Sequence, residues 1–405
     1  MLRGFRRILA YLAAERRTFA QGFAAQLLAS MGSLVGGLAL GSITGTLQRL
    51  PGLLVLIPAA VATRGNIFGA LGSRLGTSIH AGLFSANRER EGPLFQNLVG
   101  ATFLTLSVSL LLAVLAKAMM AVFGVRSISL IDLIVISILG GVLASLFVGA
   151  FSVVLAIQAY RRGWDLDSVA APLITASGDM FTVPALYVAS FAVGFRWVTP
   201  SIAGIITLIA LYATVRGVIS DLPTTRRIVR ESLPILVLAG VVDLLAGIGL
   251  QNQLNRFATF PALLILVPPI IGNAGGLGGL LSARLASKIH LGVLSPRVRP
   301  DALAALDGTL VLLIAVAVYP LMAVAAELLA LAVGIVSPGL IAMVEISILA
   351  GLMVTLLAIV VAYYGAVLTY RIGLDPDSHG IPMITSSMDF LGVFCIVLAI
   401  LAVLG

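Results

Sequence analysis

The chain has 405 residues, of which 60% are hydrophobic and 10% are charged, and its mean hydropathy is +1.13. A soluble domain carries about 25% charged residues, so the composition excludes that class and predicts an all-α polytopic protein of the lipid bilayer. The single Cys395 excludes a disulfide framework. The net charge of +8 comes from arginines in short loops beside apolar runs, which favours orientation signals over a nucleic-acid partner.

The N-terminal segment, residues 1–17, is predicted to lie on the cytoplasmic surface as an amphipathic helix. Leu2, Phe5 and Leu9 fall at helical spacing, and most of the arginines lie elsewhere on the wheel. Eleven apolar segments follow, each long enough to cross a ~30 Å hydrocarbon core. The predicted spans are 20–45, 51–82, 94–123, 128–160, 168–194, 198–220, 230–255, 261–292, 303–334, 338–370 and 378–403.

The basic residues predict the sidedness of these spans. With the N-terminus inside, 17 Lys/Arg fall in cytoplasmic segments and five at outer ends. This bias fits the positive-inside rule and predicts a plasma-membrane protein with a cytoplasmic N-terminus and an extracellular C-terminus.

The chain repeats itself at an offset of 210 residues. Residues 51–82 share 13 identities in 32 positions with 261–292, and 160–179 share 11 in 20 with 370–389. The predicted organisation is a first repeat at 18–195, a linker transmembrane helix at 196–222 and a second repeat at 223–405. Since each repeat has five spans, the linker span makes the repeats parallel and puts their pseudo-two-fold axis along the membrane normal. One fused chain would then act as a pseudo-dimer.

The fifth span of each repeat carries an acid near the predicted midplane. Asp179 lies 11 residues beyond Ser168, so ~16 Å deep, with Thr175 one helical turn before it; Asp389 and Thr385 repeat this pair. An ionised carboxylate at that depth costs at least ~2.5 kcal/mol unless a partner, water or a cation meets it. Two symmetric carboxylates suit a hard cation such as Mg²⁺; the alternative is a protonated or helix-bonded acid with a packing role.

Other polar residues surround these acids in the predicted topology. The second spans are rich in glycine, which predicts either opened backbone beside water or close helix packing, and they carry Asn66 and Asn273 as neutral oxygen donors. Asp243, whose counterpart is Ser33, is a candidate site for a coupling ion. Four acids before the fifth spans are interpreted as a cytoplasmic mouth or as ordinary helix caps: Asp165, Asp167, Asp375 and Asp377.

Two motifs, each present twice, resemble the MgtE magnesium channel and transporter family and its eukaryotic solute-carrier relatives. They are the Gly-Asn-Ala-Gly stretch at 272–275 with its counterpart Arg-Gly-Asn at 64–66, and Pro382, Thr385 and Asp389 with the counterparts in the first half. The resemblance covers nearly all of the chain after residue 17. It implies that Asp179 and Asp389 occupy the position of the family's pore aspartate, and that Mg²⁺ is the transported ion, with Mn²⁺ or Co²⁺ as alternatives.

The expected function is therefore divalent cation transport between two repeats, by a channel or a carrier, and not enzyme catalysis. One alternative is a Na⁺- or H⁺-coupled exchanger that uses Asp243. The other is an intramembrane aspartyl protease, which also needs two buried aspartates. Near-identical repeats oppose the protease, because acid and base roles need environments that push the two pKa values apart.

Overall fold

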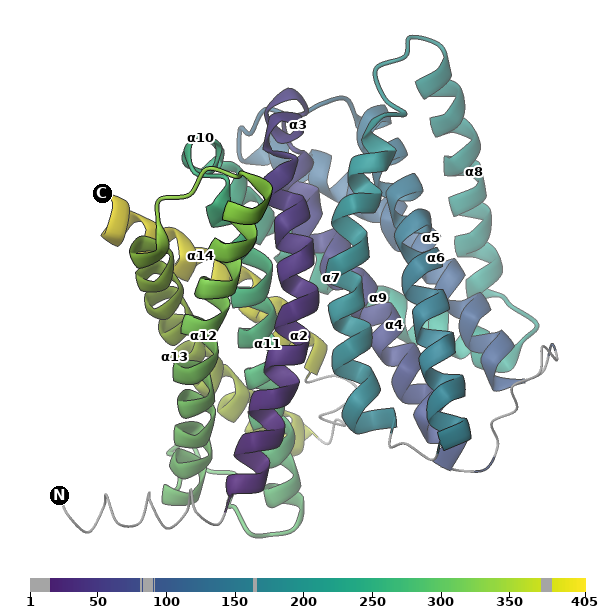
Figure 1. Ribbon diagram of the computed structural model, residues 1–405. Helices are drawn as coiled ribbons and strands as arrows, with labels where there is room; N and C mark the ends of the chain where they lie inside the picture. Colours follow the sequence, from purple (N-terminus) through teal and green to yellow (C-terminus); the bar gives the residue numbers. More distant parts are fainter. Residues whose placement is uncertain (1–14, 81, 83–89, 91, 163–165, 373–380) are drawn as a thin grey trace. The chain divides into compact units, whose positions relative to one another are not determined.

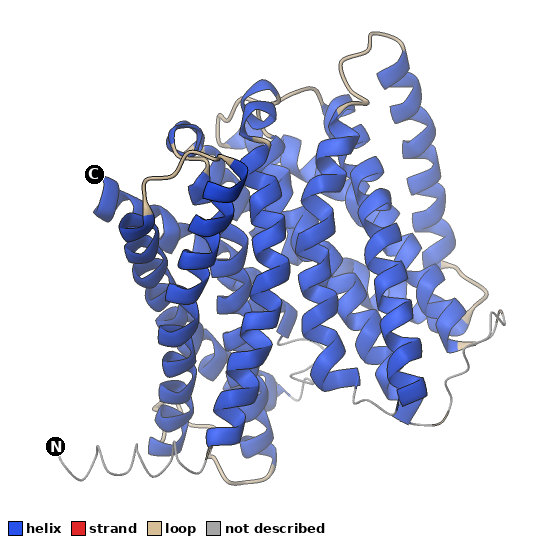
Figure 2. Cartoon of the chain, viewed as in Figure 1, coloured by secondary structure: helices blue, strands red, loops and turns tan. Residues whose placement is uncertain are grey.

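The computed structural model describes residues 15–80, 82, 90, 92–162, 166–372 and 381–405, and every regular element in these ranges is an α-helix (Figures 1 and 2). Nearly all of the predicted surface helix at 1–17 lies outside them. The helices are α2 (Arg16–Ser42), α3 (Thr44–Arg49), α4 (Leu53–His80), α5 (Pro93–Val122), α6 (Leu130–Arg162), α7 (Leu166–Ser190), α8 (Val198–Val218), α9 (Pro223–Gln251), α10 (Leu254–Thr259), α11 (Ala262–His290), α12 (Ala302–Val333), α13 (Leu340–Ile372) and α14 (Ile381–Leu404).

The long helices confirm the polytopic all-α class. Each predicted span coincides with one long helix, and ten of them are long and apolar enough to cross a bilayer; α7, which carries two acids, is not among the ten. One boundary was wrong: α9 begins at Pro223 rather than near residue 230. A proline at the first helical position needs no N–H donor, and three arginines extend this helix beyond its apolar part.

The repeat seen in the sequence recurs in the helices. The short helices α3 and α10 begin and end 210 residues apart, as do the long helices α6 and α13. Helix α8 has no counterpart among the described helices and matches the linker span. The boundaries of the two repeats, their parallel orientation and the pseudo-two-fold axis stay predictions.

The compact units of the structure do not follow the repeats. One unit is Met1–Leu34 with Ala262–Gly405, and the other is Val35–Pro261. The first unit therefore combines most of α2 with the second repeat, and the second unit combines α9 with the first repeat. Each compact unit is completed by the first helix of the other repeat.

Close contacts seat these two exchanged helices. In the first unit, Ser30 of α2 donates to Met322 Sδ of α12, and Gly22 packs on Ile314. In the second unit, α9 packs against α4 and α5, where a Cβ at Gly247 would collide with the backbone of Val55. Glycine at that crossing lets two helix backbones touch, a packing mode that membrane proteins use widely.

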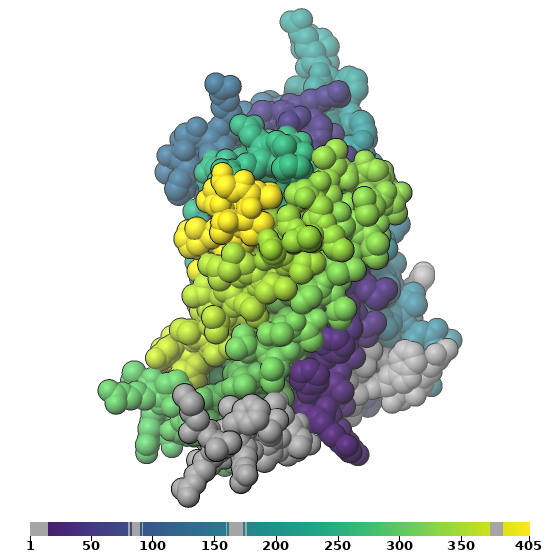
Figure 3. Space-filling model, turned by 60° about the vertical axis from the view of Figure 1, so that its left-hand side comes forward, coloured from purple at the N-terminus to yellow at the C-terminus, as the bar shows by residue number. Residues whose placement is uncertain are grey.

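Helix α8 packs on one face of the second unit, against α5 and α6. Ala210 of α8 packs on Leu110 and Ile138, and Thr214 Oγ1 donates to Ser107 Oγ at 2.8 Å. In the first unit, the counterpart of Ile138 is Ile348, which lines an apolar groove between α13 and α14. Figure 3 shows the surface of these C-terminal helices in green to yellow. A single linker helix thus makes the two repeats unequal.

Candidate ion-binding site

Asp179 lies where three helix backbones meet inside the second unit. It is partly exposed on α7, directly after Gly178. A Cβ at Gly178 would lie 3.1 Å from the backbone nitrogen of Gly65 on α4, and a Cβ at Gly36 on α2 would lie 2.5 Å from the carbonyl oxygen of Asp179. The glycines therefore let the backbones of α2 and α4 touch the backbone of α7 beside Asp179. These contacts fix the point from which the Asp179 side chain extends.

The hydroxyl groups beside Asp179 are bound to their own helix. Ser177 Oγ donates to the Ile174 carbonyl at 2.6 Å, and Thr182 Oγ1 donates to the Gly178 carbonyl at 2.6 Å. Each hydroxyl has then used its hydrogen, so its oxygen can act only as an acceptor toward other groups. The side chain of the predicted ligand Thr175 lies outside the described part of the structure.

Asp389 occupies the matching place in the first unit. Thr385, Ser387 and Asp389 of α14 are partly exposed, whereas Ser386 and Met388 between them are buried. A Cβ at Gly275 of α11 would lie 3.4 Å from Thr385 Cγ2, so the second and fifth spans of this repeat also meet at a glycine. Both aspartates therefore lie beside the same type of helix crossing, one in each unit.

Asn273 presents a buried oxygen without a hydrogen-bond partner in the described ranges. The side chain is 2% exposed, and its Nδ2 donates to Ser30 Oγ and to the Pro269 carbonyl, each at 2.8 Å. A carbonyl can only accept, so the amide nitrogen must face Pro269 and the amide oxygen Oδ1 is left over. Buried acceptors are nearly always satisfied by protein, water or an ion, and Asn273 Oδ1 is thus suited to a cation or its water.

The glycine-rich second spans remain helical throughout. Helix α4 runs unbroken past Gly65 and Asn66, and α11 runs unbroken past Gly272 to Gly279. The alternative of opened backbone with free carbonyls is therefore wrong, and close packing through small residues is confirmed by the contacts of Gly65 and Gly275. Asn66 is partly exposed one residue after the Gly65 crossing.

Asp243 is 1% exposed inside the second unit, on α9. Gly240 and Gly247 flank it on the same helix face and pack on Leu112 and Val55, so this face points at α5 and α4. Its role in ion coupling stays a prediction.

The acids of the predicted cytoplasmic mouth are mostly outside the described residues. This holds for Asp165, Asp375 and Asp377. Asp167 was expected before the helix, but it lies in the first turn of α7, which begins at Leu166. Across the described ranges, no three or more His, Cys, Asp or Glu side chains cluster as metal ligands.

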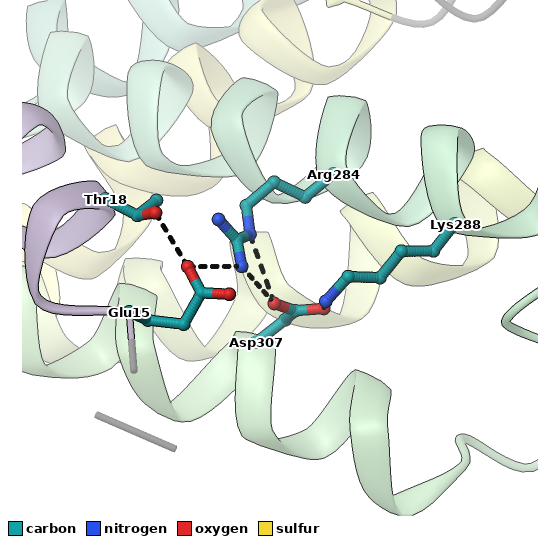
Figure 4. A network of polar contacts seen from close by, with 5 residues as sticks. All are labelled: Glu15, Thr18, Arg284, Lys288 and Asp307. Carbon is teal, nitrogen blue, oxygen red and sulfur yellow. Dashed lines mark hydrogen bonds and ion pairs between the residues drawn. The ribbon is translucent and has the colours of Figure 1, made fainter. Parts of the chain in front are cut away.

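An ionic cluster that the sequence did not reveal lies in the first unit (Figure 4). Asp307 is buried and accepts from Arg284 Nε at 3.1 Å and Nη2 at 2.8 Å, and from Lys288 Nζ at 2.6 Å. Glu15 Oε2 lies 3.3 Å from Arg284 Nη2 and accepts from Thr18 at 2.6 Å. Arg284 therefore contacts acids from two other segments of the chain. The helical spacing of Arg284 and Lys288 was the available signal, since four residues put both on one face.

The charge state of Glu15 follows from these contacts. The hydrogen bond from Thr18 and the positive charges of Arg284 and Lys288 hold the pKa of Glu15 below its ordinary value, and burial opposes them. Glu15 precedes α2, so the cluster ties the start of the exchanged helix to α11 and α12.

The comparisons with known proteins give the class of activity. A family model described as "MgtE: Divalent cation transporter" matches residues 57–189 and 267–399, well over half of the chain and at the same offset of 210 residues. Solute carrier family 41 member 3 of Rattus norvegicus is 25% identical over 398 residues, which cover 93% of this chain and 85% of the relative. Solute carrier family 41 member 2 of Homo sapiens is 24% identical over 411 residues, which cover 92% and 68%. No solved structure matches the chain.

One matched segment contains Asp179 and the other contains Asp389, and each contains the glycine-rich part of the second span of its repeat. The likeness therefore extends to the helices from which the candidate site is built. The chain belongs to the MgtE family of divalent cation transporters.

Proposed function

We propose that this protein carries Mg²⁺ across the plasma membrane, with Asp179 and Asp389 as the acids that hold the ion or its inner waters. The observation that carries the proposal is the matched pair of helix crossings, where Gly65 meets Gly178 and Gly275 meets Thr385, each placing a partly exposed aspartate in an apolar segment. Carboxylate and amide oxygens are the ligands that hard divalent cations prefer.

The neutral oxygens complete the proposed ion path. Asn273 Oδ1 is the strongest of these candidates because it is buried and has no hydrogen-bond partner in the described part of the chain. Asn66, Thr175 and Thr385 are proposed as further donors. Mg²⁺ retains several waters when proteins bind it, so few direct protein ligands are needed.

The decisive variants are Asp179→Asn and Asp389→Asn. Each keeps the size of the side chain and removes one charge, so we expect divalent uptake into liposomes to fall at least ~10-fold and Mg²⁺-dependent thermal stabilisation to shrink. The double variant should add little, because the two residues act at one site. The ion-free protein should be at least as stable as the wild type.

Asp132→Asn is the matched control. Asp132 is a partly exposed acid in the first turn of α6, where Ser129 Oγ donates to it at 2.6 Å. This control should retain uptake. Wild-type uptake and full Mg²⁺ stabilisation in either midplane variant would remove that aspartate from the ion path.

A second candidate function is exchange of a divalent cation for Na⁺ or H⁺, and the burial of Asp243 favours it. A carboxylate that is 1% exposed within an apolar helix is a typical place for a coupling ion. Uptake that depends on a Na⁺ or pH gradient, and loses that dependence in Asp243→Asn, would support exchange. Gradient-independent uptake would reject it. The family is one of transporters, and the comparisons give the aspartyl protease alternative no support.

The proposed orientation has its own test. In a Cys395→Ala background, Arg88→Cys and Arg299→Cys should both react only with a reagent added from the cytoplasmic side. Labelling of the two positions from opposite sides would overturn the parallel arrangement of the repeats.

A further inference from the structure

Arg64 is a fully buried cation in the interior of the second unit. Its side chain is 0% exposed on α4. Nη1 donates to the Ala60 carbonyl at 3.2 Å, and Nη2 donates to Ser109 Oγ at 2.6 Å, so both acceptors are neutral. Nε has no hydrogen-bond partner, and Arg64 joins none of the ion pairs, among the residues that the structure describes. A guanidinium stays protonated in proteins, so this part of the unit holds a positive charge whose hydrogen-bond acceptors in the described residues are neutral.

The second repeat fills the equivalent space without a charge. Gly141 makes room for Arg64, since a Cβ there would collide with Arg64 Nη2. At the matching glycine, Gly351, the space is taken by the ring of Tyr319, which is fully buried. At equivalent positions, the first repeat has Arg64 and Ser109 and the second repeat has Ala274 and Tyr319.

Packing alone therefore does not require an arginine. The Tyr319 hydroxyl lies 3.3 Å from Thr355 Oγ1. Ser145, the counterpart of Thr355, supplies a hydroxyl at the same position of the first repeat. A neutral pair of similar volume thus fits this helix arrangement, and the charge of Arg64 needs another explanation, because burying it is costly.

The position of Arg64 links it to the proposed ion path. The carbonyl carbon of Arg64 lies 3.6 Å from the place of a Cβ on Gly178, and Gly178 directly precedes Asp179. The backbone of Arg64 thus lies at the helix crossing that carries the carboxylate, and its guanidinium extends from there to Ser109 on α5 and to Gly141 on α6. Inside an apolar unit, a charge acts over longer distances than in water because the surroundings screen it weakly.

We propose that Arg64 is a positioning charge that weakens the binding of a divalent ion at Asp179 and so speeds its release. The proposal rests on the proposed function of Asp179 and deepens it. Without an ion, the carboxylate is stabilised by the neighbouring positive charge; with a dication bound, the same charge repels it. The site then binds the divalent ion weakly enough to release it during transport. Only one of the two repeats has a charge that produces this effect.

The repeat itself provides the test variants. Arg64→Ala with Ser109→Tyr copies the packing of the second repeat into the first and removes the charge. We expect half-maximal Mg²⁺ stabilisation at a roughly tenfold lower concentration, and a lower maximal rate of uptake. Ala274→Arg with Tyr319→Ser is the mirror variant, which adds a second charge and should raise the half-maximal concentration. Arg64→Met is the third variant, for use if the paired exchange does not fold.

The outcomes separate this proposal from a structural role and from the proposed function. A structural role would lower thermal stability without Mg²⁺ and leave the half-maximal Mg²⁺ concentration unchanged, which would overturn the proposal. Tighter binding that disappears when Asp179→Asn is added would support it. If Asp179→Asn alone leaves stabilisation and uptake intact, the proposed function fails; if Asp179→Asn abolishes both but removing the Arg64 charge changes nothing, only the present proposal fails.

Discussion

The two repeats build the same helix arrangement with different chemistry at equivalent positions. Next to Gly141 the first repeat places Arg64, and next to Gly351 the second places Tyr319, each from a different helix of the repeat. The volume beside the glycine is retained while its charge is not. Packing thus constrains the combined volume of the two side chains more tightly than the volume of either one. The charge at these positions can still differ between the two repeats.

A second pair of positions differs in the same way. In the first repeat, Arg74 Nε donates to Asn97 Oδ1 at 2.7 Å. In the second, Arg284 pairs with the buried Asp307, which Lys288 also contacts. The arginine of the first repeat therefore binds a neutral amide, and the arginine of the second repeat belongs to an ion cluster that includes Glu15. The extra charges accompany the seating of α2, because Glu15 at the start of this helix joins the ionic cluster.

The largest expected effect comes from removing the centre of the ionic cluster. Asp307→Ala would remove the buried acid that the mostly buried Arg284 and Lys288 share, and we expect a loss of about 3–5 kcal/mol in the free energy of unfolding. Asp307→Asn should cost less, because Asn97 shows that an amide accepts from the equivalent arginine. Denaturant unfolding in detergent micelles measures both.

Asn97→Asp is the reciprocal control for that comparison. It would give Arg74 an acid but remove the hydrogen bond that Asn97 Nδ2 donates to the Pro93 carbonyl at 2.8 Å. The two effects oppose each other, so we expect a change within about 1 kcal/mol. Equal losses in Asp307→Ala and Asn97→Ala would show that the ionic cluster adds nothing to the neutral version.

A smaller effect should distinguish the two glycines. Gly351→Ala would drive a methyl group into the rigid ring of Tyr319, and we expect a loss of about 1–3 kcal/mol. Gly141→Ala meets the end of the Arg64 side chain, which has more rotatable bonds, and should cost less. Gly204→Ala on α8 meets nothing within 4 Å and should be neutral or stabilising. The order of thermal midpoints checks this, and a reversed order for positions 351 and 141 would contradict it.

The smallest effect is a dependence of stability on pH through Glu15. Its pKa in the folded protein lies below the ordinary value of 4.5, so its contribution is complete above pH 4.5 and is lost as the pH falls through the folded value. Stability should therefore decline on acidification below pH 4.5, and Glu15→Gln should reduce that decline. An unchanged pH profile in this variant would exclude Glu15 as a contributor.

The spans and the duplication could be predicted because apolarity and spaced Pro, Gly, His and Asp residues are visible in the sequence. The continuity of α4 and α11 could not, because intrinsic propensity disfavours glycine in helices while packing against α7 and α14 overrides it. Asp307 meets its basic partners across two consecutive helices, and Arg64 reaches Ser109 on another helix, so spacing within one helix does not pair these residues. The candidate acids could be predicted because they recur at equivalent positions of the two repeats. The oxygen of Asn273 could not be predicted as a free acceptor, because that depends on the orientation of its amide, which only the structure gives.

The exchange of first helices has a consequence for how the protein is made. Residues 1–34 leave the ribosome well before Ala262, where the remainder of their unit starts. At roughly 5–20 residues per second, the wait for that remainder is on the order of 10–40 s. During it, Gln26 and Ser30 would face lipid or a chaperone instead of their neighbours on α11 and α12. A premature stop after the first repeat would thus leave an unseated helix, a defect that membrane quality control can recognise before any transporter has assembled.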